Sequence, residues 1–209
     1  MSPLPDTLPD MLDVSFALLD QNVGQPLLAD YRWPLWQALC GALPWLAEEP
    51  LAGVHALRVV EADYGVALLP RRTKLTLRLP FHRVRAATLL TGQHLAVSGH
   101  RLTIGEHRIT PVRGAATLYA DFVSTGSGDE AAFCRDIENE LEQLDVRCRY
   151  ICGGRRALPA GERRLAGFAL ALYDLAAEPG RRLMQAGLGG ERRLGCGILI
   201  QHRAISGLS

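Results

Sequence analysis

Residues 73–90 read TKLTLRLPFHRVRAATLL, and this stretch holds both kinds of element from which the fold is built. In its first seven residues polar and apolar side chains alternate, with a leucine at every second position from Leu75 to Leu79. Such alternation predicts a strand with one buried face. Pro80 ends the strand, and Phe81–Leu90 predicts a helix. A strand that runs directly into a helix is typical of a βαββαβ unit.

The residues on either side complete this unit. Asp30 is expected to cap a helix whose apolar residues follow one stripe. In chain order we predict a strand at Asp13–Asp20, a helix at Arg32–Leu46, a hairpin of Val54–Glu61 and Tyr64–Leu69, the strand and helix of residues 73–90, and a last strand at Leu95–Val97. The first half therefore follows the order of a ferredoxin-like unit.

The second half repeats the order. Its predicted strands are Arg101–Ile104 and Arg108–Val112, Thr117–Ser124, Arg147–Ile151, Leu165–Leu175 and Cys196–His202, and its predicted helices are Asp129–Leu144, capped by Ser127 or Asp129, and Pro179–Ala186. The sequence therefore predicts an α+β fold of two tandem ferredoxin-like units, residues 1–92 and residues 93–209.

Charge is segregated along the chain, although the formal net charge is only +1. Residues 1–70 hold nine acids and two bases, and residues 71–113 hold nine bases and one acid. Residues 114–145 hold eight acids and one base, and residues 146–209 hold eleven bases and four acids. Every basic residue except Lys74 is arginine, whose planar fork matches phosphate geometry and stacks on bases. A bias of composition toward arginine would explain that choice but not the clustering, which creates local fields.

The bulk composition excludes several classes of protein. No apolar run approaches the roughly 20 residues of a membrane span. The N-terminal residues, MSPLPDTLPDML, lack the basic start and apolar stretch of a secretory signal. The five cysteines are scattered without a CxxC pair, so neither a zinc site nor a disulfide framework is predicted. We expect a cytoplasmic protein without a membrane partner, a metal or a cofactor.

Residues 187–197 read GLGGERRLGCG, a loop between a predicted helix and a predicted strand. Its glycines let backbone approach a ligand closely, and its two arginines can reach phosphates. A dinucleotide fingerprint needs the opposite order, strand then helix, and a P-loop needs Gly-Lys-Ser/Thr after the glycines. The candidate RNA-binding residues of this loop are Gly187, Gly189, Arg192, Arg193, Gly195 and Gly197; a glycine-rich turn without a ligand is the alternative.

The full pattern resembles the C-terminal signature G-apolar-G, five residues, G-x-G of the CRISPR repeat-RNA endoribonucleases of the RAMP superfamily. That family has tandem ferredoxin-like folds. The N-terminal half is also similar to its subtype named MYXAN. The stretches that carry this similarity are Val14–Leu19, Tyr31–Leu46, Gly53-Val54-His55, Lys74–Pro80, Leu90-Thr91-Gly92 through Ile104-Gly105, and Thr117-Leu118-Tyr119.

The resemblance implies cleavage of CRISPR precursor transcripts without a metal. The ribose 2′-hydroxyl attacks the neighbouring phosphate and leaves a 2′,3′-cyclic phosphate, which needs a base, an acid and positive charge on the phosphorane. In similar enzymes the catalytic histidine lies in the first unit, in or just after the first helix, where His55 stands. Tyr31 could orient the phosphate or ribose, and packing at the start of the helix is the alternative. Lys74 is expected to stabilise phosphorane charge, as Arg71, Arg72 or Arg78 could.

Other polar residues have weaker assignments. His100 and His107 are expected to be surface RNA contacts or structural residues, His82 at a helix start has no expected role, and His202 could approach the glycine loop. The segment Arg147–Arg164 is basic, and Gly153-Gly154 and Pro159-Ala160-Gly161 are expected to make its middle a loop. An RNA stem-loop is recognised largely through its shape, phosphates and 2′-hydroxyls. Arg155, Arg156, Arg181 and Arg182 are therefore candidates to hold it.

Two alternatives stay open at the level of the sequence. One is a non-catalytic repeat-RNA-binding subunit of a CRISPR effector complex, because such subunits share the fold. The other is a ferredoxin-like protein that binds a small anion in its glycine loop. His55 favours the nuclease, since a pure RNA binder does not need it. The resemblance further implies that the protein retains the mature crRNA and joins other Cas subunits.

Overall fold

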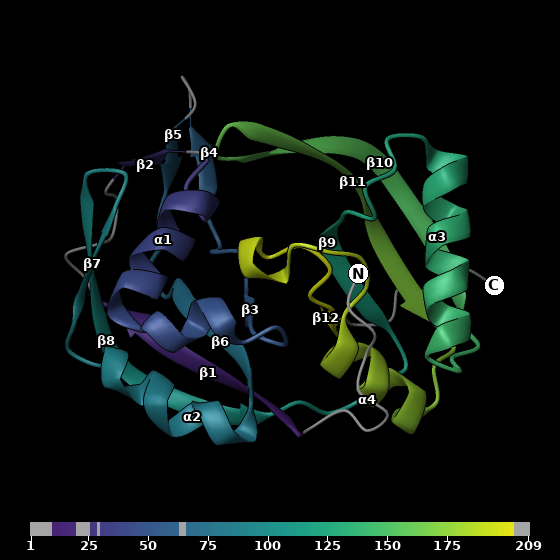
Figure 1. Ribbon diagram of the computed structural model, residues 1–209, viewed down its shortest axis with the longest axis horizontal. Helices are drawn as coiled ribbons and strands as arrows, with labels where there is room; N and C mark the ends of the chain where they lie inside the picture. The colour runs from purple at the N-terminus through teal and green to yellow at the C-terminus, as the bar shows by residue number, and fades with distance from the viewer. Residues whose placement is uncertain (1–9, 20–25, 29, 63–65, 203–209) are drawn as a thin grey trace.

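The computed structural model describes residues 10–19, 26–28, 30–62 and 66–202, which form two antiparallel sheets side by side (Figure 1). The first sheet has the order β3-β6-β1-β8-β7. Its strands are β1 (Met11–Leu18), β3 (Gly53–Val54), β6 (Lys74–Pro80), β7 (His94–Val97) and β8 (His100–Pro111). Its helices are α1 (Arg32–Ala42), α2 (Phe81–Ala87) and the 3-10 turns Pro44–Glu48 and Thr88–Leu90.

The second sheet has the order β10-β11-β9-β12. Its strands are β9 (Leu118–Val123), β10 (Arg149–Ala160), β11 (Arg163–Tyr173) and β12 (Ile200–Gln201). The helices α3 (Glu130–Gln143) and α4 (Ala177–Ala186) and the 3-10 turn Arg192–Leu194 belong to this half. A small third sheet joins β2 (Pro26–Leu28), β5 (Val66–Leu68) and β4 (Val60–Ala62).

Both large sheets confirm the predicted ferredoxin-like topology. In the first, the four strands of the βαββαβ unit are β1, β3, β6 and β8, and in the second they are β9, β10, β11 and β12. Numbered along the chain, each set lies in the spatial order 2-3-1-4. Strand β7 adds one more strand at the outer edge of the first sheet.

Two predictions are wrong in detail. The segment Val54–Glu61 is not a single strand, because β3 at its start pairs with β6 of the first sheet; only its end, in β4, forms the predicted hairpin with β5. The turn of this hairpin was predicted near Ala62–Asp63, and Asp63 lies outside the described residues. The expected strands around Gly105 form the single strand β8, which pairs with β1 and β7. The first sheet thus extends past residue 92, and we propose that the units divide within residues 112–117.

The predicted basic loop is instead part of a long hairpin. Strands β10 and β11 pair from Arg149 opposite Tyr173 to Ala160 opposite Arg163, with one irregularity between Cys152 and Arg155. The glycines expected to break the strand fall at this irregularity. The hairpin therefore carries the arginines along its whole length and turns near Gly161 (Figure 1).

Each half has its own apolar core, and the second half also reaches into the first. In the first half the leucines of α1 and β6 are fully buried, as their periodicity predicts. Four buried residues from the second half join this core: Phe122, Ala160, Leu194 and Cys196. They come from β9, the tip of the hairpin and the glycine loop. Each Å² of apolar surface that these residues bury contributes about 25 cal/mol, and this burial stabilises the docking of the two halves.

The helix ends differ between the halves. Asp129 caps α3 as predicted, and its side chain accepts a hydrogen bond from the amide of Ala132 at 2.9 Å. The predicted cap Asp30 is wrong: α1 begins after Tyr31, and no side chain caps it. Within the part of the chain that the structure describes, no helix is both long and apolar enough to cross a membrane.

Candidate functional site

A cleft of about 940 Å³ lies where the two halves meet. The first half contributes the start of α1 and residues 55–59, which follow β3. The second half contributes β9, the end of β10 and the glycine loop, including Gly195 and Ile198. The cleft thus joins segments from both ferredoxin-like units, and polar residues of both units line it.

His55 occupies the wall of this cleft. Its backbone amide donates to the carbonyl of Thr76 at 2.9 Å, which extends the pairing of β3 with β6 by one residue. Its side chain is 16% exposed, and Nε2 lies 3.4 Å from Oδ1 of Asp13 on β1. Nε2 is buried and makes no well-aligned hydrogen bond with the described residues. The part of the side chain that is exposed is therefore not Nε2.

Asp13 is held in place by Arg78, directly opposite it in the pairing of β1 with β6. The guanidinium of Arg78 donates to both carboxylate oxygens, from Nε at 2.8 Å and from Nη2 at 2.9 Å. The arginine side chain is 1% exposed. A bidentate, buried pair of this kind fixes the position of the carboxylate.

Burial and charge set the protonation of this group. Burial lowers the pKa of His55, and the positive charges of Arg78 and Arg192 add to this, while Asp13 opposes it. Burial raises the pKa of Asp13, but the hydrogen bonds and charge of Arg78 and the proximity of His55 outweigh it, so the net shift is downward. His55 is then a neutral imidazole at neutral pH, and Asp13 is an ionised carboxylate.

Arginines from both halves line the cleft. Arg32 donates to the carbonyl of Leu194 in the glycine loop at 2.9 Å and lies 4.0 Å from Asp121. Arg156 forms an ion pair with Asp121 at 3.0 Å. The exposed side chain of Arg58 makes no ion pair with any described residue. Of these three cations, Arg58 is the one whose charge is not already balanced by a described acid.

The glycine loop packs against the segment that carries His55. A Cβ at Gly195 would stand 3.0 Å from the amide of Ala56 and 3.0 Å from the carbonyl of Val54, the two neighbours of His55. A Cβ at Gly197 would lie 1.8 Å from the carbonyl oxygen of Leu188, across the loop. Both glycines have positive φ, at 78° and 65°. Only glycine therefore fits these positions.

The eleven-residue loop, the paired sheets and the histidine in the cleft match a known family. The family model Cas6, described as "Cas6 Crispr", matches residues 12–204. The chain belongs to the Cas6 family. It is 33% identical over 178 residues to the "CRISPR-associated endonuclease Cas6" of Myxococcus xanthus (strain DK1622), covering 85% of this chain and 77% of that relative. The predicted family and the predicted enzyme class, an endoribonuclease, are thereby confirmed.

Solved structures show the same fold. A structure described as "CRISPR associated protein Cas6" superposes with a TM-score of 0.65 at 9% identity, covering 93% of this chain and all of that one. A second, described as "An RAMP protein binding different RNA substrates", gives 0.61 at 14% identity, covering 91% of this chain and 98% of that one. The tandem ferredoxin-like arrangement of this Cas6 chain is therefore shared with both.

The three predicted catalytic residues of this Cas6 chain are not all brought together. His55 and Tyr31 both line the cleft. Tyr31 is 3% exposed and its hydroxyl donates to the carbonyl of Leu57 at 3.2 Å, which makes it a core residue with one edge at the cleft. Lys74 is exposed at the start of β6 and is not among the residues that line the cleft. Roles for Tyr31 and Lys74 in catalysis stay predictions.

The two arginines of the glycine loop separate. Arg192 points inward, and its Nη1 donates to the carbonyls of Gln185 and Ala186 at the end of α4. Burial lowers the pKa of Arg192 to about 10. Arg193 points outward, where it pairs with Glu191 at 2.8 Å and lies over the ring of Trp33. The prediction that both reach phosphates does not fit this arrangement for Arg192.

The loop glycines are likewise turned toward protein rather than toward open space. A Cβ at Gly187 would meet Nη1 of Arg192, and one at Gly189 would meet the carbonyl of Ser124. Together with Gly195 and Gly197, all four predicted RNA-binding glycines therefore have a packing role. Contacts of their backbone with RNA stay a prediction.

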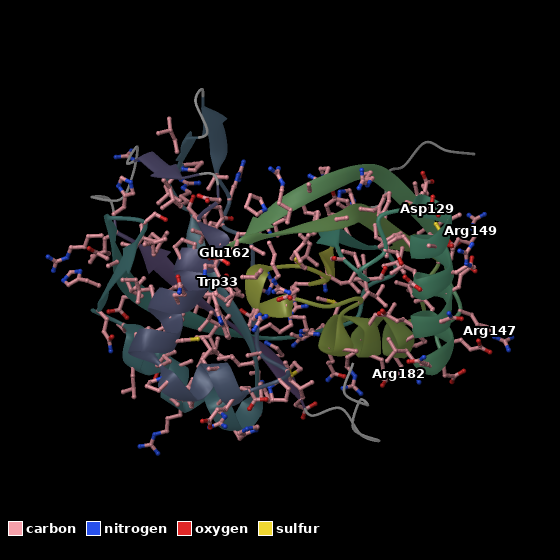
Figure 2. All side chains as sticks on the ribbon, turned by 45° about the horizontal axis from the view of Figure 1, so that its top comes forward. Trp33, Asp129, Arg147, Arg149, Glu162 and Arg182 are labelled. Atoms are coloured by element: carbon pink, nitrogen blue, oxygen red, sulfur yellow. The ribbon has the colours of Figure 1, made fainter. Side chains whose placement is uncertain are left out.

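The other predicted RNA-binding arginines are spread over the second half. Arg155 and Arg156 on β10 are both exposed, and Arg156 lines the cleft. Arg181 on α4 pairs with Glu178 at 2.7 Å, and Arg182 donates to the carbonyl of Asp145. Figure 2 shows Arg182, Arg147 and Arg149 around α3, away from Trp33 on α1 and Glu162 at the hairpin tip. The structure thus brings only Arg156 of this set to the cleft.

The sequence did not single out Asp13, Arg58 or Arg32. Asp13 and Arg78 are both charged residues in predicted strands, and a pairing of those strands in register would have placed them opposite each other. Within the described residues no cluster of three or more His, Cys, Asp or Glu side chains could hold a metal ion. His94 and His107 hydrogen-bond threonines, and His202 packs on Tyr119.

Proposed function

We propose that this protein cuts CRISPR repeat RNA in the cleft between its two units, with His55 as a proton-transfer group. The proposal is supported by membership of the Cas6 family, whose relative in Myxococcus xanthus is named an endonuclease. It rests above all on the position of His55, a histidine of the first unit on the wall of a cleft shared by both units.

The proposed reaction is a transesterification within the RNA chain. The 2′-oxygen of the ribose attacks the adjacent phosphorus, and the bond from phosphorus to the 5′-oxygen of the next nucleotide breaks. The products are a 2′,3′-cyclic phosphate and a 5′-hydroxyl. One proton leaves the attacking 2′-hydroxyl and one is given to the departing 5′-oxygen, so a base and an acid are needed.

His55 suits the part of the base. A base must be unprotonated before the reaction, and the lowered pKa of His55 keeps the imidazole neutral at neutral pH. We assign Nδ1 to this step, because Nε2 is buried against Asp13. General bases of this kind contribute about 10²- to 10⁴-fold to a rate.

The cleft arginines suit the binding and stabilisation of phosphate. Arg58 offers a guanidinium without a described acidic partner, and Arg32 and Arg156 share one partner, Asp121. Two arginines against one carboxylate leave positive charge available for an RNA phosphate or for the developing phosphorane. We further propose that the mature crRNA stays bound here and that the protein joins other Cas subunits.

The substrate itself provides the test. Purified protein is incubated with a labelled CRISPR repeat stem-loop in excess EDTA, beside the same RNA with a 2′-deoxy nucleotide at the cut position. The expected result is one cut that ends in a 2′,3′-cyclic phosphate, and no cut in the deoxy substrate although it binds equally well. Cleavage of the deoxy substrate would contradict 2′-hydroxyl attack. Tight binding of both RNAs without any cut would favour the non-catalytic RNA-binding subunit.

A further inference from the structure

A half-buried aspartate and a fully buried arginine link His55 to the second unit. Arg78 holds the carboxylate of Asp13 with Nε and Nη2. Its remaining nitrogen, Nη1, donates to the carbonyl of Met184 at 3.0 Å and to that of Leu199 at 2.7 Å. Met184 lies on α4 and Leu199 just before β12, so both carbonyls belong to the second unit. One arginine side chain of the first sheet thus spans the junction.

A carboxylate beside one ring nitrogen controls which nitrogen of a histidine carries the proton. The Oδ1 of Asp13 faces Nε2 of His55 at 3.4 Å, and nothing else described bonds that nitrogen. A proton on Nε2 is favoured by the neighbouring negative charge, which leaves Nδ1 unprotonated and able to act as the base. Loss of such a carboxylate in other histidine-dependent enzymes lowers activity because the wrong tautomer forms.

We infer that Asp13 and Arg78 are positioning residues for His55, and that docking of the second unit on Arg78 sets the orientation and tautomer of the histidine. This inference rests on the catalytic role proposed for His55. It makes the cleft active only when the two ferredoxin-like units are seated on each other, since the carbonyls that hold Arg78 come from the second unit.

The charges around His55 decide in which direction its pKa changes when Asp13 is replaced. Among the described residues, the charged groups that act on the ring are the acid Asp13 on β1 and the cations Arg78 on β6 and Arg192 of the glycine loop. Replacing Asp13 by asparagine removes the charge that favours the imidazolium. The pKa of His55 then falls, and a base with a lower pKa becomes unprotonated at a lower pH.

The first experiment compares Asp13→Asn with the unmodified protein in single-turnover cleavage of the repeat stem-loop across pH. We expect the maximal rate to fall about tenfold to hundredfold, a part of what a general base contributes. We also expect the acidic limb of the pH profile to move to lower pH. An unchanged rate and an unchanged profile in folded D13N would overturn the inference.

A second measurement needs no catalysis. In protein labelled with ¹⁵N-histidine and free of RNA, the ring nitrogens of His55 are titrated by NMR. The unmodified protein should show the tautomer protonated at Nε2, and Asp13→Asn should show a lower pKa and a mixture of tautomers. Identical titrations and tautomers in both proteins would overturn the inference independently of activity.

A matched surface pair serves as control. Arg149 Nε lies 2.8 Å from Asp174 Oδ2, the same distance as in the Arg78–Asp13 pair, but both side chains are more than 60% exposed. Asp174→Asn should leave rate, pH profile and His55 titration unchanged. A change in D174N equal to that in D13N would show a nonspecific effect of lost charge and would contradict the positioning role.

A variant that removes both charges separates positioning from folding. Asp13→Leu combined with Arg78→Met leaves no unpaired buried ion, and such replacements are commonly tolerated. We expect this protein to fold and bind RNA but to cut as slowly as D13N; wild-type cutting would overturn the inference. The wider proposal is tested separately by His55→Ala. If His55→Ala still cuts, the catalytic role of His55 fails, whereas if only the Asp13 variants cut normally, this inference alone fails.

Discussion

The two ferredoxin-like units have the same strand order but carry different parts of the site. The first unit presents Asp13 from β1, and His55 and Arg58 from the segment that follows β3. The second unit extends a long hairpin and a glycine loop across the junction. Figure 1 shows this loop, in yellow, between the two sheets.

The comparison shows that the same strand order can present a reactive side chain in one unit and a packing loop in the other. In the first unit the segment after β3 is short and holds a reactive side chain against the next strand. In the second unit the loop before the last strand is built of glycines that press on that segment from the other side. The first unit supplies the reactive side chain, and the second unit packs against the segment that carries it. The site is therefore complete only when the two units are docked.

The largest effect is expected in the glycine loop. Gly197→Ala would place a methyl group against the carbonyl of Leu188 at a positive φ. We expect a loss of about 4 kcal/mol or more in the free energy of unfolding, measured with urea. Gly41→Ala in helix α1 of the first unit has open space around it and should instead stabilise by roughly 0.5 kcal/mol. Equal effects would show that the loop tolerates side chains.

A smaller loss is expected at the junction itself. Asp13→Asn leaves Arg78 buried without its anion, which should cost about 3 kcal/mol at neutral pH, whereas exposed Asp174→Asn should cost little. The folded pKa of Asp13 is lowered, so its contribution is present above the unfolded pKa and is lost as pH falls through the folded pKa. In urea unfolding, the difference in the free energy of unfolding between the unmodified protein and D13N should become smaller below about pH 4. A difference in the free energy of unfolding that does not change with pH would contradict this.

The topology could be predicted from the sequence because it depends on local patterns. Alternation in β6 and β9 and the apolar stripes of α1 and α3 decide strand or helix within a few residues. The errors fell where the outcome depends on distant partners. Whether residues 54–61 pair with β6 or with β5, and whether β8 continues through Gly105, is decided by strands far away in the sequence.

The site could be predicted only in part for the same reason. The glycine pattern and His55 were visible through a family resemblance. The partner of His55 was not, since Asp13 and Arg78 are 65 residues apart and their register must be known first. Two adjacent arginines in one short turn point in different directions, so the sequence could not tell that guanidinium nitrogens of Arg192 are buried while the side chain of Arg193 is 42% exposed.

A moderate effect is expected on RNA binding. Arg58→Ala removes a cleft cation and should weaken binding of the repeat RNA about tenfold at moderate salt, with the salt dependence reduced by about one counterion. Arg149→Ala, at the far end of the second unit, should change affinity less than twofold, a rough bound from the screening of exposed charges. Filter binding over a series of salt concentrations would check this. A larger loss in R149A than in R58A would place the RNA outside the cleft.

The smallest effect concerns the first helix of each unit. Asp129→Ala removes the cap of α3 and should lower the free energy of unfolding by about 1 kcal/mol. Asp30→Ala should leave stability unchanged, because α1 has no side-chain cap. Urea unfolding of both variants would decide this, and an equal loss in D30A would mean that α1 is capped in solution.

The most direct test of the account compares His55→Ala with the unmodified protein in single-turnover cleavage of the repeat stem-loop, with RNA affinity measured on the same samples. The account predicts that cleavage falls about 10²- to 10⁴-fold while affinity stays within a fewfold. Cleavage at an undiminished rate, or a loss of binding that accounts for the whole loss of cutting, would contradict the claim that His55 performs the chemistry between the two units.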